Sequence, residues 1–350
     1  MATLESRNHI LPDSGYPITL HSHFNTKIVA HIPPEPPHAE RTPAPDRGLL
    51  ADPDKRALLT AATRTDLTES IGTLTQLDDL ALLVSERRVV FFRDQDLTTE
   101  QQVKLFEHYG ELDKHPAQKG QRHVNIGASN DDFREILNYT PWPQGDWHAD
   151  TSFEINPPSY SLLRMEEAPD VGGDTQWVSQ YGLYEALSPH LRAFLENDTI
   201  LDLWGVGPNR APVDTHHPAV ITHPVTELKA LNVTNNFVTG FAELKKKESG
   251  MDAHGLAADH QGRWKWEKGS VAIWDNRATA HRAIPGKYTQ TRRGIRTTVF
   301  GTKLVFNPTS GSRDERAVRL KTEASISKHR RVDSTQNRQK EQEDASIVPA

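Results

Sequence analysis

The sequence contains no cysteine among its 350 residues. That absence excludes disulfides, zinc sites built on thiolates, iron–sulfur clusters, thiolate-ligated haem and cysteine nucleophiles. Any metal site must therefore use histidine and carboxylate ligands. The chain has 17 histidines, so its composition allows such a site.

Long apolar runs are also missing. The longest runs, such as Leu80–Val84 and Val89–Phe92, are far shorter than the roughly 18 apolar residues of a membrane span. The first ten residues are polar, include Glu5 and lack the apolar core of a secretory signal. The net charge of −6 provides no overall attraction to nucleic acid or to acidic membranes. We therefore expect a soluble cytoplasmic protein with neither of these as a partner.

Hydrophobic residues make up only 35% of the chain, which is below the average for globular domains. We predict an extended Pro-rich N-terminal arm over residues 1–55, one folded domain over residues 56–306 and a polar C-terminal tail over residues 307–350. The basic run Lys328–Arg331 could be a nucleic-acid or targeting patch, but nearby acids such as Glu341 favour a solvated tail.

The predicted domain starts with helical signals and continues with strands. Leu77–Arg87 predicts a helix, Val89–Phe92 predicts a buried strand, and Thr98 is a candidate N-cap for a short helix that ends near Gly110. Further short strands, separated by Gly, Pro, Asn and Asp turns, are predicted at Tyr160–Met165, Thr175–Val178, Val220–Thr222, Ala230–Val233, Ser270–Trp274 and Ile295–Phe300. This pattern indicates a mainly β fold with flanking helices, a sandwich or barrel with the jelly roll as the leading choice.

An H-A-D tripeptide at 148–150 is the first candidate for chemistry. In a β-strand, residues i and i+2 lie on the same face, so its imidazole and carboxylate could bind one cation. So short a pattern also occurs by chance in a chain with 17 histidines. A similar H-A-E tripeptide at 38–40 lies in the Pro-rich arm, where nothing fixes its geometry, and we interpret it as structural or solvent-facing.

Residues near the end of the domain strengthen the first pattern. His281 follows the predicted strand Ser270–Trp274 and a turn. Arg296 lies four positions after Arg292, so both guanidinium groups are expected on one face of a strand, with Arg293 on the other. Two histidines, one carboxylate and two aligned arginines are typical of a non-haem iron site beside an anion pocket.

With these residues the chain resembles a known family, the Fe(II)/2-oxoglutarate-dependent dioxygenases of the taurine dioxygenase (TauD/TfdA) type, in their fungal branch. Seven ordered blocks carry the resemblance. They are V-V-F-F-R-D-Q-D-L (89–97), G-E-L-D-K-H-P (110–116), W-H-A-D (147–150), G-G-D-T-Q-W (172–177), H-P-V-T-E-L-K-A-L-N-V (223–233), W-D-N-R-A-T-A-H (274–281) and R-R-G-I-R (292–296). Several blocks in order are a far stronger signal than any single motif.

The resemblance implies a fold, a reaction and cofactors. The family core is a double-stranded β-helix, a cupin-like jelly roll. Its members use Fe(II), 2-oxoglutarate and O2, and they couple decarboxylation of 2-oxoglutarate to succinate and CO2 with hydroxylation of a substrate carbon. They often form dimers or tetramers, so a homo-oligomer is expected.

The same resemblance assigns the catalytic residues by position. His148, Asp150 and His281 would ligate the iron. Thr175 and Arg292 would bind the distal carboxylate of 2-oxoglutarate, whose keto-acid end chelates the metal.

Three further positions match residues that bind the substrate. Arg296 and His115 correspond to residues that hold the substrate anion, a sulfonate in taurine dioxygenase, and Phe237 corresponds to an aromatic residue that lines the pocket. Two positions depart from the taurine enzymes, because Gln118 stands in place of an aromatic residue and Gln144 in place of an asparagine. We therefore expect a remodelled pocket that still binds an anion, and taurine itself is doubtful.

Several of these residues have simpler alternative roles. His115 precedes a proline and could be a solvated turn residue, Phe237 could belong to the core, and Arg296 could pair with a structural carboxylate. The tryptophans that flank the motifs are interpreted as packing residues: Trp147, Trp177 and Trp274.

The segment 248–263 looks short for the family, which also indicates a changed pocket wall. Three hypotheses for function follow from the sequence. The first hypothesis is a dioxygenase that hydroxylates a small sulfonate or alkyl sulfate. The second is the same chemistry on another anion, such as an aryloxyalkanoate, an amino acid or a biosynthetic intermediate. The third is a catalytically silent jelly-roll binding protein, against which the intact His–Asp–His set argues.

Overall fold

The computed structural model describes most of the predicted domain and short parts of both flanking segments. The described residues are 41–56, 74–113, 124–128, 147–197, 200–205, 213–234, 236–245, 258–284, 290–319 and 321–322. Strands predominate in them, with a few helices at the edges. Within these ranges, every helix is too short or too polar to cross a membrane.

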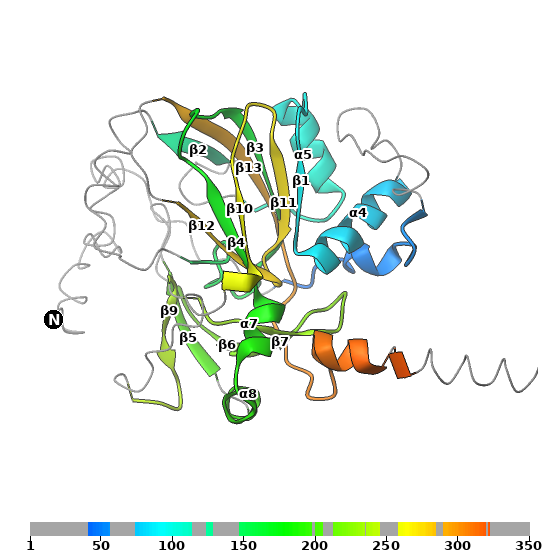
Figure 1. Cartoon of the computed structure of the whole chain (residues 1–350), viewed down its shortest axis with the longest axis vertical. Helices are drawn as coiled ribbons and strands as arrows, with labels where there is room; N and C mark the ends of the chain where they lie inside the picture. Colours follow the sequence, from blue (N-terminus) through cyan, green and yellow to red (C-terminus); the bar gives the residue numbers. More distant parts are fainter. Residues whose placement is uncertain are drawn as a thin grey trace, which may run out of the picture.

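The larger sheet has five antiparallel strands in the order β1-β11-β3-β13-β2 (Figure 1). The strand bounds are Val89–Phe92 for β1, Val124–Ala128 for β2, Pro158–Glu167 for β3, Val271–Asp275 for β11 and Arg292–Phe300 for β13. The central strand, β3, is buried along its first eight residues, because it pairs on both edges and packs on both faces.

A smaller antiparallel sheet in the order β10-β4-β12 packs against the larger one. Its strands are Gln261–Trp264 for β10, Thr175–Ser179 for β4 and Thr279–Ala283 for β12. Trp177 of β4 lies 5.9 Å from Trp274 of β11, measured between ring centroids, and both belong to one buried cluster with Met165 of β3. Two antiparallel sheets around a shared core form the layers of a jelly roll. The predicted packing role of these two tryptophans is confirmed.

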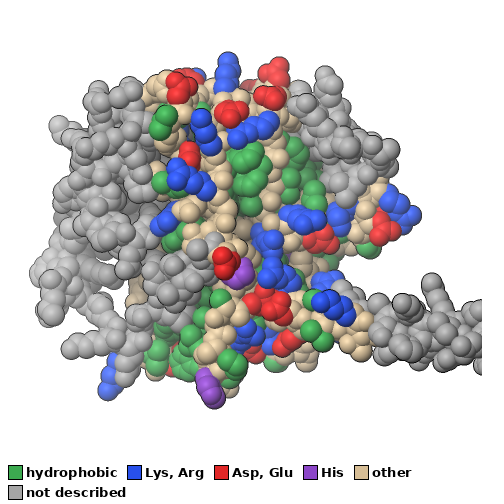
Figure 2. Space-filling model, viewed as in Figure 1, with side chains coloured by type: hydrophobic (Ala, Val, Ile, Leu, Met, Phe, Trp, Pro, Cys, Tyr) green, Lys and Arg blue, Asp and Glu red, His purple; other side chains and the backbone are tan. Residues whose placement is uncertain are grey.

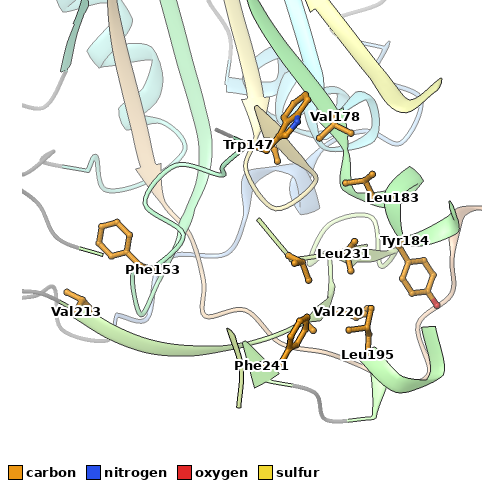
Figure 3. Packing of buried hydrophobic residues seen from close by; sticks show 13 residues of the cluster. Trp147, Phe153, Val178, Leu183, Tyr184, Leu195, Val213, Val220, Leu231 and Phe241 are labelled. Carbon is orange, nitrogen blue, oxygen red and sulfur yellow. The ribbon is translucent and has the colours of Figure 1, made fainter. Parts of the chain in front are cut away.

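The remaining strands and two helices lie below the two sheets in Figure 1. They comprise the sheet β6-β5-β9 (Val213–Pro218, Ile200–Gly205, Val238–Phe241), the hairpin β7-β8 (Val220–Thr222, Lys229–Leu231), α7 (Gln180–Ala186) and α8 (Pro189–Glu196). Their apolar side chains form a separate core, shown in Figure 3. Trp147 belongs to this core, so the cluster fixes the residue directly before His148.

Helices cover the outer face of the larger sheet beside β1. They are α4 (Leu74–Arg87), α5 (Thr99–Glu107) and the short 3-10 helix η2 (Arg47–Leu50); a second 3-10 turn, η5 (Ala258–His260), precedes β10. Leu80 of α4 and Phe106 of α5 pack on Ile273 of β11 in one buried cluster. The predicted N-cap is confirmed, because Thr98 and Gln101 form a capping box at the start of α5.

Both flanking segments contact the sheets where the structure describes them. Asp46 accepts hydrogen bonds from the Tyr160 hydroxyl at 2.8 Å and from Nη1 of Arg277 at 2.7 Å. Residues 313–319 form a helix, orange in Figure 1, and Arg313 pairs with Glu185 of α7 at 2.7 Å. Parts of the predicted arm and tail therefore pack on the domain, and the predicted limits at 55/56 and 306/307 remain predictions.

Charged side chains of both signs are interspersed on the face shown in Figure 2. Hydrophobic side chains come to the surface between them near the upper sheet edges. The described part of this face thus carries a mixed charge pattern, as the small net charge of the chain suggests.

Candidate active site and metal centre

Two histidines that are far apart in the sequence are held together by their backbones. His148 and His281 form an isolated antiparallel bridge, with N–H···O distances of 3.0 and 2.8 Å. His281 lies on β12, and its imidazole centroid is 4.3 Å from that of His148. Because both backbone hydrogen bonds are made, the two rings must leave the chain side by side.

Asp150 joins the two histidines through a turn. The sequence analysis argued that residues 148 and 150 would share one face if they lay in a strand, yet only His148 makes a strand-like bridge and a turn begins at Asp150. The next residue, Thr151, has a φ of +37°, a conformation rarely adopted by a β-branched residue. The strand ends here because the chain reverses, and the bridge and turn together bring the three side chains to one place.

The three side chains form a compact set of metal-ligand atoms. One ligand atom from each of His148, Asp150 and His281 lies within 4.8 Å of the others, and this is the one such group among the described residues. Nε2 of His281 is 3.8 Å from Oδ1 of Asp150, which is too far for a hydrogen bond between them. Two imidazoles and one carboxylate form the donor set of non-haem iron sites with open coordination positions. The residues present therefore fit Fe(II).

The electrostatics of the site favour the ligating forms of these groups. Burial opposes ionisation of Asp150, but the nearby Arg296 and His281 outweigh it and lower its pKa to about 2. Burial and the neighbouring His148 lower the pKa of His281 to about 3. At neutral pH the carboxylate is charged and the His281 imidazole is neutral, as metal ligation requires.

Each carboxylate oxygen of Asp150 has a different neighbour. Oδ2 accepts a hydrogen bond from the Ser161 hydroxyl at 2.7 Å. Oδ1 contacts Nη1 of Arg296 and is the oxygen nearest to His281. Arg296, which is predicted to bind a substrate anion, thus contacts Asp150, whose carboxylate is predicted to bind iron. Its Nε is buried and has no hydrogen-bond partner among the described residues, so the guanidinium retains a donor for a ligand.

The structure brings Thr175 and Arg292 together. Nη2 of Arg292 lies 3.4 Å from the Thr175 hydroxyl, which also accepts a hydrogen bond from the Trp266 indole at 2.9 Å. Because both neighbours donate to this oxygen, the hydroxyl hydrogen of Thr175 remains available. A buried guanidinium beside a donating hydroxyl suits a carboxylate ligand.

The turn before Thr175 fixes the position of Arg292. Gly172 and Gly173 have φ values of +87° and +70°, as expected for turn glycines. The Gly173 carbonyl accepts a hydrogen bond from Nε of Arg292 at 2.8 Å. A Cβ at Gly173 would lie 3.0 Å from Cδ of Arg292, so a larger residue would disturb this arginine.

Aromatic side chains border the histidines. The Phe237 ring is 6.4 Å from the His148 ring and 4.9 Å from the Phe153 ring. Phe237 is half-buried at the edge of the lower core, so it contacts both the core and the site. His115, Gln118 and Gln144, which the sequence placed near the substrate, lie outside the described residues.

Two residues near Asp150 escaped the sequence analysis. Ser161 donates to the carboxylate, and Asn276 contacts both Ser161 and the backbone N–H of Asp150. Asn276 stands in the W-D-N-R-A-T-A-H block, where we considered only the histidine and a turn. This block marked Asn276 as part of a family motif, but a local pattern does not show which distant residue an asparagine side chain contacts.

Comparisons with known proteins agree with this geometry. Residues 55–298 match the family described as taurine catabolism dioxygenase TauD, TfdA family. An alpha-ketoglutarate-dependent sulfonate dioxygenase from Saccharomyces cerevisiae is 34% identical over 59% of this chain and 56% of its own length. An alpha-ketoglutarate-dependent sulfate ester dioxygenase from Pseudomonas putida is 28% identical over 76% of this chain and 88% of its own. The crystal structure of a taurine dioxygenase from Burkholderia xenovorans superposes with a TM-score of 0.58 and 32% identity, covering 70% of this chain and 86% of that one.

Proposed function

Because the chain belongs to the TauD/TfdA family of iron(II)- and 2-oxoglutarate-dependent dioxygenases, we propose that it hydroxylates a small organic sulfonate or alkyl sulfate. The observation that carries this proposal is the His148–Asp150–His281 cluster, in which Asp150 and His281 are buried and His148 is half-buried, flanked by Arg292 and Arg296. The cluster supplies the iron ligands, and the two guanidinium groups can each bind an anion. Relatives named for sulfonate and sulfate ester substrates support the choice of anion.

His148, Asp150 and His281 would hold the iron, and Thr175 with Arg292 would bind the distal carboxylate of 2-oxoglutarate. Iron with bound 2-oxoglutarate and O2 supplies the oxidising power that hydroxylates carbon. The protein itself contributes by orienting these molecules and by excluding water. Trp274 and Trp177 assist in this, because their buried rings lie 5.0 and 6.4 Å from the His281 ring.

Arg296 and Phe237 are the proposed substrate residues in the described part of the chain, and His115 is their proposed partner. Nε of Arg296 has no acceptor in the part of the chain that the structure describes, which supports a bound anion, since a buried donor without an acceptor is costly. Phe237 and Phe153 give the site an apolar side for the carbon chain of the substrate. Arg296 would thus hold the acidic end while the aromatic rings direct the carbon to be hydroxylated.

A second candidate is the same reaction on a carboxylate-bearing substrate. It is favoured by Gln118 and Gln144, which depart from the taurine enzymes at two positions near the substrate residues. Arg296 would serve such an anion equally well, because guanidinium groups pair bidentately with carboxylates.

A substrate panel distinguishes these candidates. Hydroxylation of the carbon that bears sulfur releases sulfite from a sulfonate, and hydroxylation of the ester carbon releases sulfate from an alkyl sulfate. We expect succinate together with one of these two products. Succinate without either product, on a carboxylate substrate, would support the second candidate. A protein that gives no visible charge-transfer band with Fe(II) and 2-oxoglutarate under anaerobic conditions would instead be a silent binding protein.

We also propose that residues 56–306 form the catalytic domain and that the protein acts in the cytoplasm as a dimer or tetramer. The match over residues 55–298 supports the domain limits. Light scattering after size-exclusion chromatography tests the assembly, and cell imaging of the tagged protein tests the location.

A further inference from the structure

The turn that joins β11 to β12 presents side chains to two different sides of the molecule. Asp275 and Arg277 form a buried ion pair on one side. Asn276, between them, reaches Asp150 instead. Asn276 is only 5% exposed, and its side-chain amide makes four hydrogen bonds.

Its partners fix the orientation of this amide. Oδ1 of Asn276 accepts hydrogen bonds from the backbone N–H of Asp150 at 3.1 Å and from the indole N–H of Trp274 at 3.0 Å. Both neighbours can only donate, so an amide nitrogen cannot occupy this place. The Nδ2 group therefore faces the Ser159 carbonyl at 3.3 Å and the Ser161 hydroxyl at 2.9 Å.

The three neighbours of Ser161 together determine where its hydroxyl hydrogen lies. The Ser161 oxygen accepts from Asn276 and lies 2.7 Å from Oδ2 of Asp150 and 3.1 Å from the Thr298 hydroxyl. An ionised carboxylate can only accept, whereas Thr298 can donate. The single hydrogen of Ser161 therefore goes to Asp150, and Thr298 donates to Ser161.

We infer that Asn276 is a positioning residue that sets how Asp150 meets a metal ion. It holds the backbone of Asp150 directly and supports the Ser161 hydrogen bond to Oδ2, so that Oδ1, which lies nearest to His281 and also contacts Arg296, is the ligand oxygen. A carboxylate held in this way would bind a metal ion through one oxygen, which would leave more coordination positions for other ligands. The inference rests on the proposed function in one respect, namely that Asp150 is an iron ligand.

The rest of the turn keeps Asn276 in place. The Asp275 carboxylate accepts hydrogen bonds from Arg277, from His223 at 2.8 Å and from Ser85 at 3.1 Å. These partners come from the turn itself, from the β7–β8 connection and from α4. The turn is thus tied to three parts of the fold, and Asn276 cannot shift without breaking a buried network.

The test is Mn(II) binding to the purified full-length protein, measured by titration calorimetry and by electron paramagnetic resonance. Asn276→Asp keeps the shape of the side chain and its acceptor oxygen, but it cannot donate to Ser161. Ser161→Ala removes the hydroxyl that donates to Oδ2 of Asp150. We expect each variant to raise the Kd for Mn(II) by about 10–100-fold. Their effects should not add in the double variant, because both act through the same hydrogen bond to Asp150.

Asn156→Asp is the matched control. Asn156 is 3% exposed and hydrogen-bonded to Arg41 and Gly301, but it contacts none of the candidate ligands. It should lower the thermal midpoint of the apo-protein and leave the Kd for Mn(II) unchanged. Wild-type affinity in a folded Asn276→Asp variant, or an equal loss in Asn156→Asp, would overturn the positioning role. If the wild-type protein itself bound no Mn(II), the proposed function would fail, and the inference with it.

Discussion

At the scale of single residues, Thr175 shows how one hydroxyl can serve two purposes. Its oxygen accepts hydrogen bonds from Arg292 and Trp266, and its hydrogen remains for a ligand. Thr175 was predicted from its sequence block alone, whereas its contact with Trp266 was not. Loss of the Thr175 hydroxyl would therefore have two effects, because it would also leave the buried indole N–H of Trp266 without this acceptor.

Thr175→Val should weaken 2-oxoglutarate binding without changing the metal ligands. The loss of one hydrogen bond to a charged ligand corresponds to about 1.5–3 kcal/mol, or roughly 10–150-fold in Kd. Anaerobic titration of the Fe(II) protein with 2-oxoglutarate measures this change. The control is Thr279→Val, because that buried hydroxyl bonds only to a backbone carbonyl in the described structure. Equal losses in the two variants would contradict the assignment.

Arg296→Ala should weaken binding of the substrate identified in the panel by about 2–5 kcal/mol and leave 2-oxoglutarate binding nearly intact. The reason is that Nε of Arg296, which has no partner among the described residues, is the proposed donor to the substrate anion, while Thr175 contacts the other arginine, Arg292. Substrate and 2-oxoglutarate affinities are measured separately. Arg293→Ala is the control, because this neighbour is exposed and pairs with Glu167. A similar loss of both ligands would show that the two arginines had been assigned wrongly.

His223 should make the stability of the apo-protein depend on pH. Its Nε2 donates to Asp275, while its Nδ1 accepts from two backbone N–H groups, so a second proton has no place. Burial lowers its pKa, and nearby Arg277 adds to this, while Asp275 and Asp46 oppose it; the Tyr181 ring packs on the imidazole.

Because the folded-state pKa of His223 lies below the unfolded value of about 6.5, the unfolded chain takes up the proton first. The stability contribution is complete above pH 6.5 and is lost as the pH falls below it, by up to about 1.4 kcal/mol per pH unit. Chemical denaturation between pH 7.5 and 5 should show this slope, and His223→Gln should reduce it by about one proton. An unchanged slope would mean that His223 is charged in the folded protein.

At the scale of elements, α5 depends on its first turn. Thr98 and Gln101 satisfy each other's backbone N–H groups in a capping box. Thr98→Ala should reduce the free energy of unfolding by about 1 kcal/mol, because one N–H at the helix start loses its acceptor. Denaturant unfolding measures the loss. Gln101→Ala, which removes the reciprocal bond, should cost less than Thr98→Ala if the threonine is the principal cap.

Elements with strong local patterns were predicted well from the sequence. Val89–Phe92 and Val220–Thr222 are strands with the predicted bounds, and the predicted helix Leu77–Arg87 lies within α4. Apolar β-branched runs and helical periodicity reflect burial directly, so the type and position of these segments could be predicted from the sequence alone.

Strands made of polar residues were missed. β6 reads V-D-T-H-H-P, and its side chains alternate between buried and exposed. His217 is buried there because its Nε2 donates to the Glu154 carbonyl, a partner that no local pattern reveals. The turn at Asp150 escaped for the same reason, since a backbone bridge to His281 and a positive φ at Thr151 set its shape. Long-range hydrogen bonds, rather than propensity, decide such segments.

At the scale of the whole molecule, the metal site joins residues from distant parts of the fold, so metal binding should stabilise the domain. At a Mn(II) concentration 100 times the Kd, the gain is about 2.7 kcal/mol. For a domain of this size that corresponds to a rise of roughly 5–10 °C in the thermal midpoint. Differential scanning fluorimetry measures the rise. It should vanish in His148→Ala and in Asp150→Ala, and a persistent rise in both would place the ion elsewhere.

The contact between Asp46 and Arg277 has a practical consequence. Asp46 comes from the segment that the sequence marked as an arm, and it supplies an acidic partner for a buried guanidinium in the turn that carries Asn276. A shortened protein beginning at residue 56 would retain His148, Asp150 and His281, yet Arg277 would lose one of its two counter-ions. Low activity of such a trimmed protein would therefore reflect a destabilised turn around Asn276 rather than the loss of a proposed catalytic residue.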